Sequence, residues 1–227
     1  MSGSEKESLG IFSELPKKLR DRLNKARIER KFGPGEIIFR EGTPGDGVYI
    51  IRKGRVMLYS FSAYGDRKIF DIISEGDVIG EMALIDEEPR SMTAETVTAV
   101  ESDFISREDF TREILSEREA ILPLLRLVVR RLRRLDEHVE EIIFQGVPAR
   151  VAAAIAYLAD RFGVRSEKNG KTIIQLKITH AELADLVGTS REYASKFIAQ
   201  FQNDGILKCS RGMMEIFDLE GLKSWTQ

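Results

Sequence analysis

The chain has 227 residues, of which 42% are hydrophobic and 32% are charged, so it is long enough to bury the cores of two modest domains. Its net charge of −2 excludes an overall attraction to nucleic acid, so any such contact must come from a local patch. A single cysteine, Cys209, excludes an internal disulfide. The chain has only two histidines, His138 and His180, so we predict no metal site. No apolar run approaches transmembrane length and the first residues are polar, so we expect a cytoplasmic protein without a membrane partner.

The first half of the chain changes from a helical to a strand-like pattern. Helix is predicted over residues 9–30 from Leu9, Ile11 and Phe12, followed by Leu15, Leu19 and Leu23 at helical spacing. From Lys31 onward, short runs rich in Ile, Val, Tyr and Phe alternate with glycines, which predicts strands. These runs are residues 36–39, 47–54, 55–61, 68–73 and 91–106. Many short strands with tight glycine turns predict a closed antiparallel β-roll of the jelly-roll type.

One segment within this predicted roll is chemically unusual. Residues 79–95 read IGEMALIDEEPRSMTAE, which places Glu81 nine residues before Arg90 around an apolar turn. A carboxylate and a guanidinium at this spacing form either a surface ion pair or a small pocket that accepts both an anion and a hydroxyl. The residues alone leave both interpretations open.

A long helix is predicted next, beginning before Ile121 and ending where Gly146 and Pro148 break it. Apolar residues recur along it in alternating steps of four and three, which is typical of a coiled-coil seam. The seam residues are Ile121, Leu125, Val128, Leu132, Leu135, Val139 and Ile142. We interpret the seam as a homodimer interface, the alternative being a helix packed on its own roll. Five arginines off the seam are interpreted as a solvated face, and they are Arg126, Arg130, Arg131, Arg133 and Arg134.

The last third of the chain contains a helical pair. A helix over residues 149–162 and a strand pair with Asn169-Gly170 at its tip are predicted to precede it. Thr179 and Glu182 are predicted to form a capping box for the helix HAELADLV, and Gly188 then permits a turn. Thr189 or Ser190 is predicted to cap the second helix, REYASKFIAQFQNDG, which Gly205 ends. Two short helices joined by a glycine turn predict a helix-turn-helix.

The second helix of this pair is a candidate for contact with DNA, because the first residues of such a helix face base edges in the major groove. Arg191 can donate two hydrogen bonds to guanine, and Glu192 can accept one from cytosine. The alternative is an ordinary helical hairpin in which Glu192 completes a capping box with Thr189. The candidate DNA-contacting residues are Thr189, Ser190, Arg191, Glu192, Ser195 and Lys196.

These segments, in this order, resemble the cyclic-AMP receptor protein / fumarate–nitrate regulator (CRP/FNR) family of bacterial transcription regulators. The resemblance covers nearly the whole chain. It lies in PGEIIFREGTPGDGVYIIRKGRVMLY, GDVIGEMALIDEEPRS, the seam, and ELADLVGTSREYASKFIAQFQNDGIL. It implies an α+β fold with an N-terminal antiparallel β-roll that binds cyclic nucleotides over residues 1–117. A long dimerisation helix over 118–145 and a C-terminal winged helix-turn-helix over 146–227 would follow.

The resemblance also implies a ligand site. Gly80 would let the backbone approach the ligand, Glu81 would accept a hydrogen bond from the ribose 2′-hydroxyl, and Arg90 would pair with the cyclic phosphate. Residues 82–85 would begin a short helix whose free N–H groups suit an anion. At the two positions where the cyclic-AMP receptor contacts the purine through hydroxyls, this chain has Leu135 and Asp136. The implied ligand residues are Gly80, Glu81, Met82, Ala83, Arg90, Ser91 and Asp136.

The function implied by the resemblance is a dimeric regulator gated by cAMP or cGMP. Its partners would be a second copy of the chain, a palindromic DNA operator and RNA polymerase. Lys196 stands where the receptor has arginine, which implies a related half-site with weaker discrimination at one base. Two alternatives stay open: a ligand-independent regulator with a relic pocket, and a nucleotide sensor whose helical domain contacts protein. An enzyme is not expected, because no nucleophile–base pair, metal cluster or P-loop is present in the sequence, and no catalytic residue is assigned.

Overall fold

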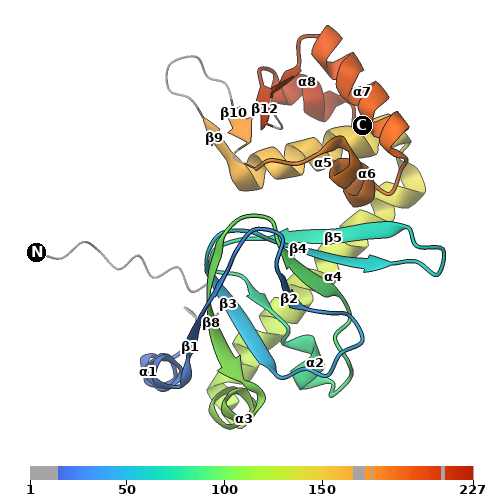
Figure 1. The fold of residues 1–227 in the computed structure, drawn as a ribbon. Helices are drawn as coiled ribbons and strands as arrows, with labels where there is room; N and C mark the ends of the chain where they lie inside the picture. The colour runs from blue at the N-terminus through green and yellow to red at the C-terminus, as the bar shows by residue number, and fades with distance from the viewer. Residues whose placement is uncertain (1–14, 166–171, 175, 211–212, 227) are drawn as a thin grey trace, which may run out of the picture. The chain divides into compact units, whose positions relative to one another are not determined.

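A computed structural model describes residues 15–165, 172–174, 176–210 and 213–226 (Figure 1). The chain folds as two compact units, Met1–Arg133 and Arg134–Gln227. The boundary falls inside the long helix, and the predicted division into three parts stays a prediction. None of the helices in the described ranges has the length and apolar character that crossing a membrane requires.

The first unit contains the predicted β-roll, built from two four-stranded sheets in which all neighbouring strands are antiparallel. The first sheet has the order β1 (Ile28–Phe32), β8 (Val100–Ser106), β3 (Gly47–Lys53) and β6 (Val78–Ile79). The second has the order β2 (Ile37–Phe39), β7 (Thr93–Thr96), β4 (Val56–Phe61) and β5 (Arg67–Ile73). The strands predicted from the apolar runs are confirmed, and β1 and β6 are added to them.

Strand β3 is buried on both faces, which explains its continuous apolar sequence. Its residues alternate between two cores, so that Val48 and Ile50 face the helices whereas Tyr49 and Ile51 lie between the sheets. Gly54 follows the strand with φ +95°, and a Cβ at this position would lie 2.2 Å from the backbone oxygen of Ala99, just before β8. Only glycine fits there, and the turn leads directly into β4.

Three short helices flank the roll. They are α1 (Lys17–Ala26), α2 (Met82–Ile85) and α3 (Arg107–Phe110), and the π-helix η2 (Thr111–Leu115) follows α3. The helical prediction for residues 9–30 was wrong at its C-terminal end, because Ile28 begins a strand that pairs with β8 opposite Phe104. The backbone hydrogen bonds that β1 forms with β8 are favoured over a continuation of the helix. Leu9, Ile11 and Phe12 lie outside the described residues.

The long helix α4 (Arg118–Phe144) is confirmed and has two different apolar faces. Ala120 and Pro123 are buried, and Leu124 and Leu127 pack against the core beneath α1 and α3. The seam lies on another face and is between 43% and 57% exposed in the single chain. Packing on the roll therefore uses one face of α4 and leaves the complete seam uncovered within one chain.

The second unit continues from α4 into α5 (Val147–Phe162), whose start at the Gly146-Pro148 break confirms the predicted helix within two residues. Its sheet has the order β11-β12-β10-β9, and its helix pair is α6 and α7 (Figure 1). The bounds are β9 (Gly163–Arg165), β10 (Thr172–Ile174), α6 (His180–Val187), α7 (Arg191–Asn203), β11 (Leu207–Ser210), β12 (Met213–Ile216) and α8 (Leu219–Ser224). The strand pair is confirmed as β9 and β10, and its tip at Asn169-Gly170 lies outside the described residues.

Candidate functional site

Gly80 and Glu81 form a sharp corner between β6 and α2. Gly80 has φ +87°, and a Cβ on it would lie 2.2 Å from Arg90 Nη1, so this residue must be glycine for the guanidinium to reach the backbone. Glu81 follows as the N-cap residue of α2 and is 0% exposed. The corner therefore directs the Glu81 carboxylate into the protein.

Arg90 is held rigidly from three sides and is only 3% exposed. Its Nη1 donates to Gly80 O at 2.6 Å, and its Nη2 donates to Gly47 O and to Asp46 Oδ1, both at 2.7 Å. The guanidinium also lies over the ring of Phe39, 4.3 Å from its centroid. Its Nε is buried and makes no hydrogen bond. Backbone, ring and carboxylate thus fix a positive charge in a buried place.

Glu81 is paired with Arg131 of α4 rather than with Arg90. Arg131 Nη1 contacts Glu81 Oε1, and Arg131 Nη2 donates to Val78 O. The other carboxylate oxygen, Glu81 Oε2, is buried and makes no hydrogen bond. A surface ion pair between Glu81 and Arg90 is therefore excluded, since both side chains are buried and each has a different partner.

The prediction of a solvated arginine face was wrong for Arg131. A signal was present in the sequence, because Arg131 continues the 124–127–131 spacing of the α4 face that packs on the roll. Its long stem reaches the roll from that face while its charge meets a buried carboxylate. Asp46 was also missed, since it lies 44 residues before Arg90 in the sequence.

The remaining predicted ligand residues differ in their exposure to solvent. Ala83 is buried in α2, whereas Met82 and Ser91 are exposed, and Ser91 Oγ lies 4.0 Å from Met82 Sδ. Asp136 belongs to the second unit, and its part in the site stays a prediction. The centre combines a buried acceptor oxygen without a hydrogen bond, a fixed guanidinium and the start of a helix. This combination can accept a hydroxyl and bind an anion at the same time.

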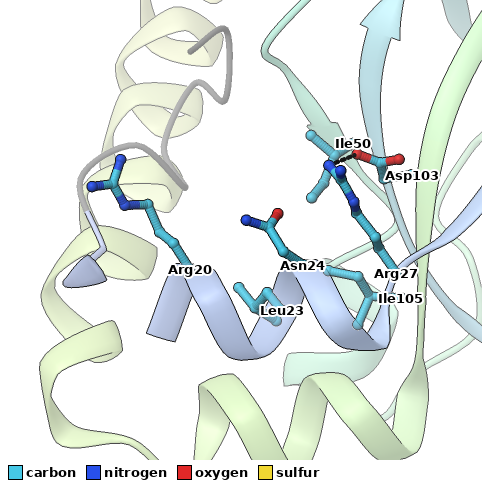
Figure 2. Close-up of a pocket in the computed structure, with 7 residues that line it drawn as sticks. All are labelled: Arg20, Leu23, Asn24, Arg27, Ile50, Asp103 and Ile105. Atoms are coloured by element: carbon cyan, nitrogen blue, oxygen red, sulfur yellow. Dashed lines mark hydrogen bonds and ion pairs between the residues drawn. The ribbon is translucent and has the colours of Figure 1, made fainter. Parts of the chain in front are cut away.

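A separate crevice lies between α1 and the first sheet and does not belong to this centre (Figure 2). Arg27 Nη1 donates to the buried carboxylate of Asp103 at 3.0 Å, and Arg52 also pairs with Asp103. These ion pairs satisfy the Asp103 carboxylate, so it needs no ligand to balance its charge. We attribute the crevice to the packing of α1 against the first sheet. Its lining residues are Arg20, Leu23, Asn24, Arg27, Ile50, Asp103 and Ile105.

The helix pair of the second unit has the predicted caps. Thr179 and Glu182 form the full capping box of α6, and Gly188 makes the turn with φ +74°. Ser190 is the N-cap of α7, because its hydroxyl accepts from the N–H of Tyr193. The alternative capping box between Thr189 and Glu192 is therefore wrong. The pKa of Glu192 is instead lowered first by a hydrogen bond with its own backbone N–H, and then by a hydrogen bond with the side chain of Ser190.

Helix α7 has one buried and one exposed face. Ala194, Ile198 and Phe201 are fully buried, which fixes the rotation of the helix. The predicted DNA-contacting residues lie elsewhere on it or at its start: Ser190, Arg191, Glu192 and Lys196 are exposed, and Thr189 and Ser195 are half-buried. Two cationic side chains and three hydroxyls are thereby brought together with Glu192 near the N-terminal end of α7.

Comparisons with known proteins agree with both the β-roll and the helix-turn-helix. Residues 29–117 match the model of the cyclic nucleotide-binding domain, and residues 149–225 match that of the Crp-like helix-turn-helix domain. The CRP-like cAMP-activated global transcriptional regulator of Mycobacterium tuberculosis is 33% identical over 213 residues, covering 94% of each chain. The Cyclic AMP receptor protein of Thermus thermophilus is 30% identical over 187 residues, covering 82% of each chain.

The chain belongs to the CRP/FNR family of transcription regulators. A crystal structure of a CRP/FNR regulator from Thermus thermophilus has the same fold, with a TM-score of 0.74 at 27% identity over 88% of this chain and 98% of that one. The α+β prediction is confirmed, and the helical hairpin alternative is replaced by a DNA-binding helix-turn-helix. The Mycobacterium tuberculosis relative is named as a transcriptional regulator, and this chain, as a member of the same family, is a regulator and not an enzyme.

Proposed function

We propose that this CRP/FNR regulator is a homodimer that binds a palindromic operator and is gated by a 3′,5′-cyclic nucleotide, with cAMP as the effector. The support for the ligand is the buried centre of the roll. Glu81 Oε2 is buried without a hydrogen bond, so it needs a donor such as a ribose hydroxyl. Arg90 supplies a fixed positive charge nearby, linked to the same corner through Gly80 O.

The choice of cAMP rests on relatives. The Mycobacterium tuberculosis relative is named as cAMP-activated, and the Thermus thermophilus relative as a cyclic AMP receptor protein. In the proposed complex, Glu81 accepts from the ribose hydroxyl, Arg90 and the start of α2 bind the phosphate, and Ser91 adds a hydroxyl. Asp136 is the proposed contact for the purine amine from the dimer helix, although desolvating its carboxylate opposes this contact.

The homodimer is supported by the seam on α4. Seven apolar residues at alternating spacings of four and three remain exposed although a neighbouring face of the same helix is packed on the roll. A second copy of α4 in parallel would cover them and form a symmetric interface. The two recognition helices α7 would then be placed on one face of a duplex, where half-sites about 34–36 Å apart match a palindrome. Because the proposed regulator acts on DNA, we propose that it works in the cytoplasm and that RNA polymerase is its partner.

A ligand-independent regulator is the second candidate, and the ion pairs of the centre favour it. Arg131 neutralises Glu81, and Asp46 neutralises Arg90, so the charges of the centre are balanced without a ligand. Such a protein would keep the centre as a structural element. Binding of nucleotide distinguishes the two candidates.

Calorimetry of the purified protein with cAMP, cGMP and the acyclic 5′-AMP is the test. We expect heat and saturation with cAMP, weaker binding of cGMP, and no saturation with 5′-AMP. Arg90→Ala should weaken cAMP binding by about 1.5–3 kcal/mol, since a charge-assisted contact is lost. Lys53→Ala removes an exposed cation from the end of β3 and should leave the affinity unchanged. Wild-type protein that gives no heat and no thermal shift with either cyclic nucleotide would establish the ligand-independent candidate.

A further inference from the structure

A side-chain hydrogen bond joins the two helices of the helix-turn-helix. His180 is the first residue of α6, and its Nδ1 lies 2.9 Å from the Oγ of Ser195 on α7. Both residues are half-buried, whereas Lys196 beside Ser195 is exposed. The bond therefore connects a residue outside the recognition helix to a hydroxyl that lies among the DNA-contacting residues.

This bond changes what Ser195 can offer to a base. A serine hydroxyl rotates freely, donates one hydrogen and accepts through two lone pairs, so it contacts donors and acceptors on base edges alike. When its hydrogen points to Nδ1, only lone pairs remain for DNA. When Nδ1–H donates to Oγ instead, the hydroxyl hydrogen remains for a base acceptor. In the first state Ser195 can only accept, and in the second the bond to the imidazole fixes the directions in which its hydrogen and its remaining lone pair point.

We propose that His180 is a positioning residue for base recognition, which fixes the hydroxyl of Ser195 so that Ser195 discriminates at one base pair of each half-site. The proposal rests on the proposed operator binding and deepens it. His180 acts through Ser195 and contacts no base itself. Without His180, the hydroxyl would turn to suit either a donor or an acceptor, and the preference at that base pair would disappear.

The surrounding structure holds both partners in place, as such a role requires. The capping box of Thr179 and Glu182 fixes the first turn of α6, where His180 begins the helix. The buried Ala194 precedes Ser195 and sets the rotation of α7. The donor and acceptor are thus aligned by backbone elements rather than by flexible side chains.

The test is a base-preference profile. An operator is selected from a random duplex library in the presence of cAMP, and each base pair of the half-site is then substituted symmetrically. Affinities of the full chain for this panel are measured for wild type, Ser195→Ala, His180→Phe, His180→Asn and the Ser195→Ala/His180→Phe double variant. Phenylalanine keeps a ring but no nitrogen, whereas asparagine places a polar group near the position of Nδ1.

We expect Ser195→Ala and His180→Phe to lose the same roughly three- to tenfold preference at one base pair, the size of one hydrogen bond. The double variant should lose no more than either single variant, and His180→Asn should retain the preference. A His180→Phe protein that binds every duplex more weakly by one factor, with its profile unchanged, would overturn the proposal. Should this variant fail to fold, His180→Ala gives the same comparison. A wild-type protein without preference at any base pair would instead overturn operator binding itself.

Discussion

The ion pair between Glu81 and Arg131 gives the sharpest prediction about the energetics of the roll. Arg131→Met keeps an apolar stem but removes the only charge that contacts the Glu81 carboxylate among the described contacts. Glu81 is 0% exposed, and the Arg131 side chain is 30% exposed. Removing one partner of a buried pair costs about 3–5 kcal/mol. Because water reaches Arg131, we expect a loss at or below the lower end, about 2–3 kcal/mol in the free energy of unfolding.

A double-mutant cycle separates this pair from other effects of the substitution. Glu81→Gln alone leaves Arg131 partly hydrated and should cost about 1 kcal/mol or less. The contact of Arg131 with Val78 O is lost in both proteins that carry Arg131→Met, so it cancels in the coupling. We expect the double variant to be more stable than the sum of the singles predicts, by about 1–3 kcal/mol.

Urea unfolding at one fixed protein concentration is the assay, since a dimer has concentration-dependent stability. The slope of the unfolding free energy against urea should be the same for all four proteins. Additive single effects, or an Arg131→Met protein within about 0.5 kcal/mol of wild type, would refute the inference that Arg131 compensates a buried carboxylate.

Three further predictions concern assembly, pH and DNA. Leu132→Asp places a charge in the seam and should give a monomer in sedimentation at concentrations on the order of tens of micromolar, where Arg133→Asp, off the seam, stays dimeric. The pKa of Glu113 is held below its usual value, first by the hydrogen bond from Arg112 and then by that from Arg22. As acid is added, the unfolded chain therefore binds more protons than the folded chain does. Melting temperature should therefore fall below about pH 5, and less steeply in Glu113→Gln; parallel curves would contradict this. Arg191→Ala should weaken binding to the matched operator by about 1–3 kcal/mol in a duplex titration and binding to random DNA by less; equal losses would assign Arg191 to a phosphate.

The predictions from sequence succeeded where local pattern and structure coincide. The strands carry their own β-branched runs, Thr179 and Glu182 carry the capping signal, and the seam of α4 repeats within one helix. Ser190 rather than Thr189 caps α7, a difference of one residue that the sequence left open. Such features depend on neighbours within about one helical turn.

The parts that were missed depend on contacts far apart in the chain. Ile28 leaves the helical pattern because its partner strand lies about 75 residues later, opposite Phe104. Arg131 reaches Glu81 across 50 residues, and His180 reaches Ser195 across 15. The sequence suggested the residue types at the site, but it could not predict which charge would neutralise which.

The affinity for cAMP, measured by calorimetry with and without saturating operator duplex at one salt concentration, tests the gating most directly. If the nucleotide favours the arrangement of the recognition helices that binds the operator, the operator must tighten cAMP binding by the same factor by which cAMP tightens operator binding. We predict a factor of about 5–150, the usual range of such coupling. Equal cAMP affinities in the presence and absence of the operator would contradict the account and show that nucleotide binding does not control DNA binding.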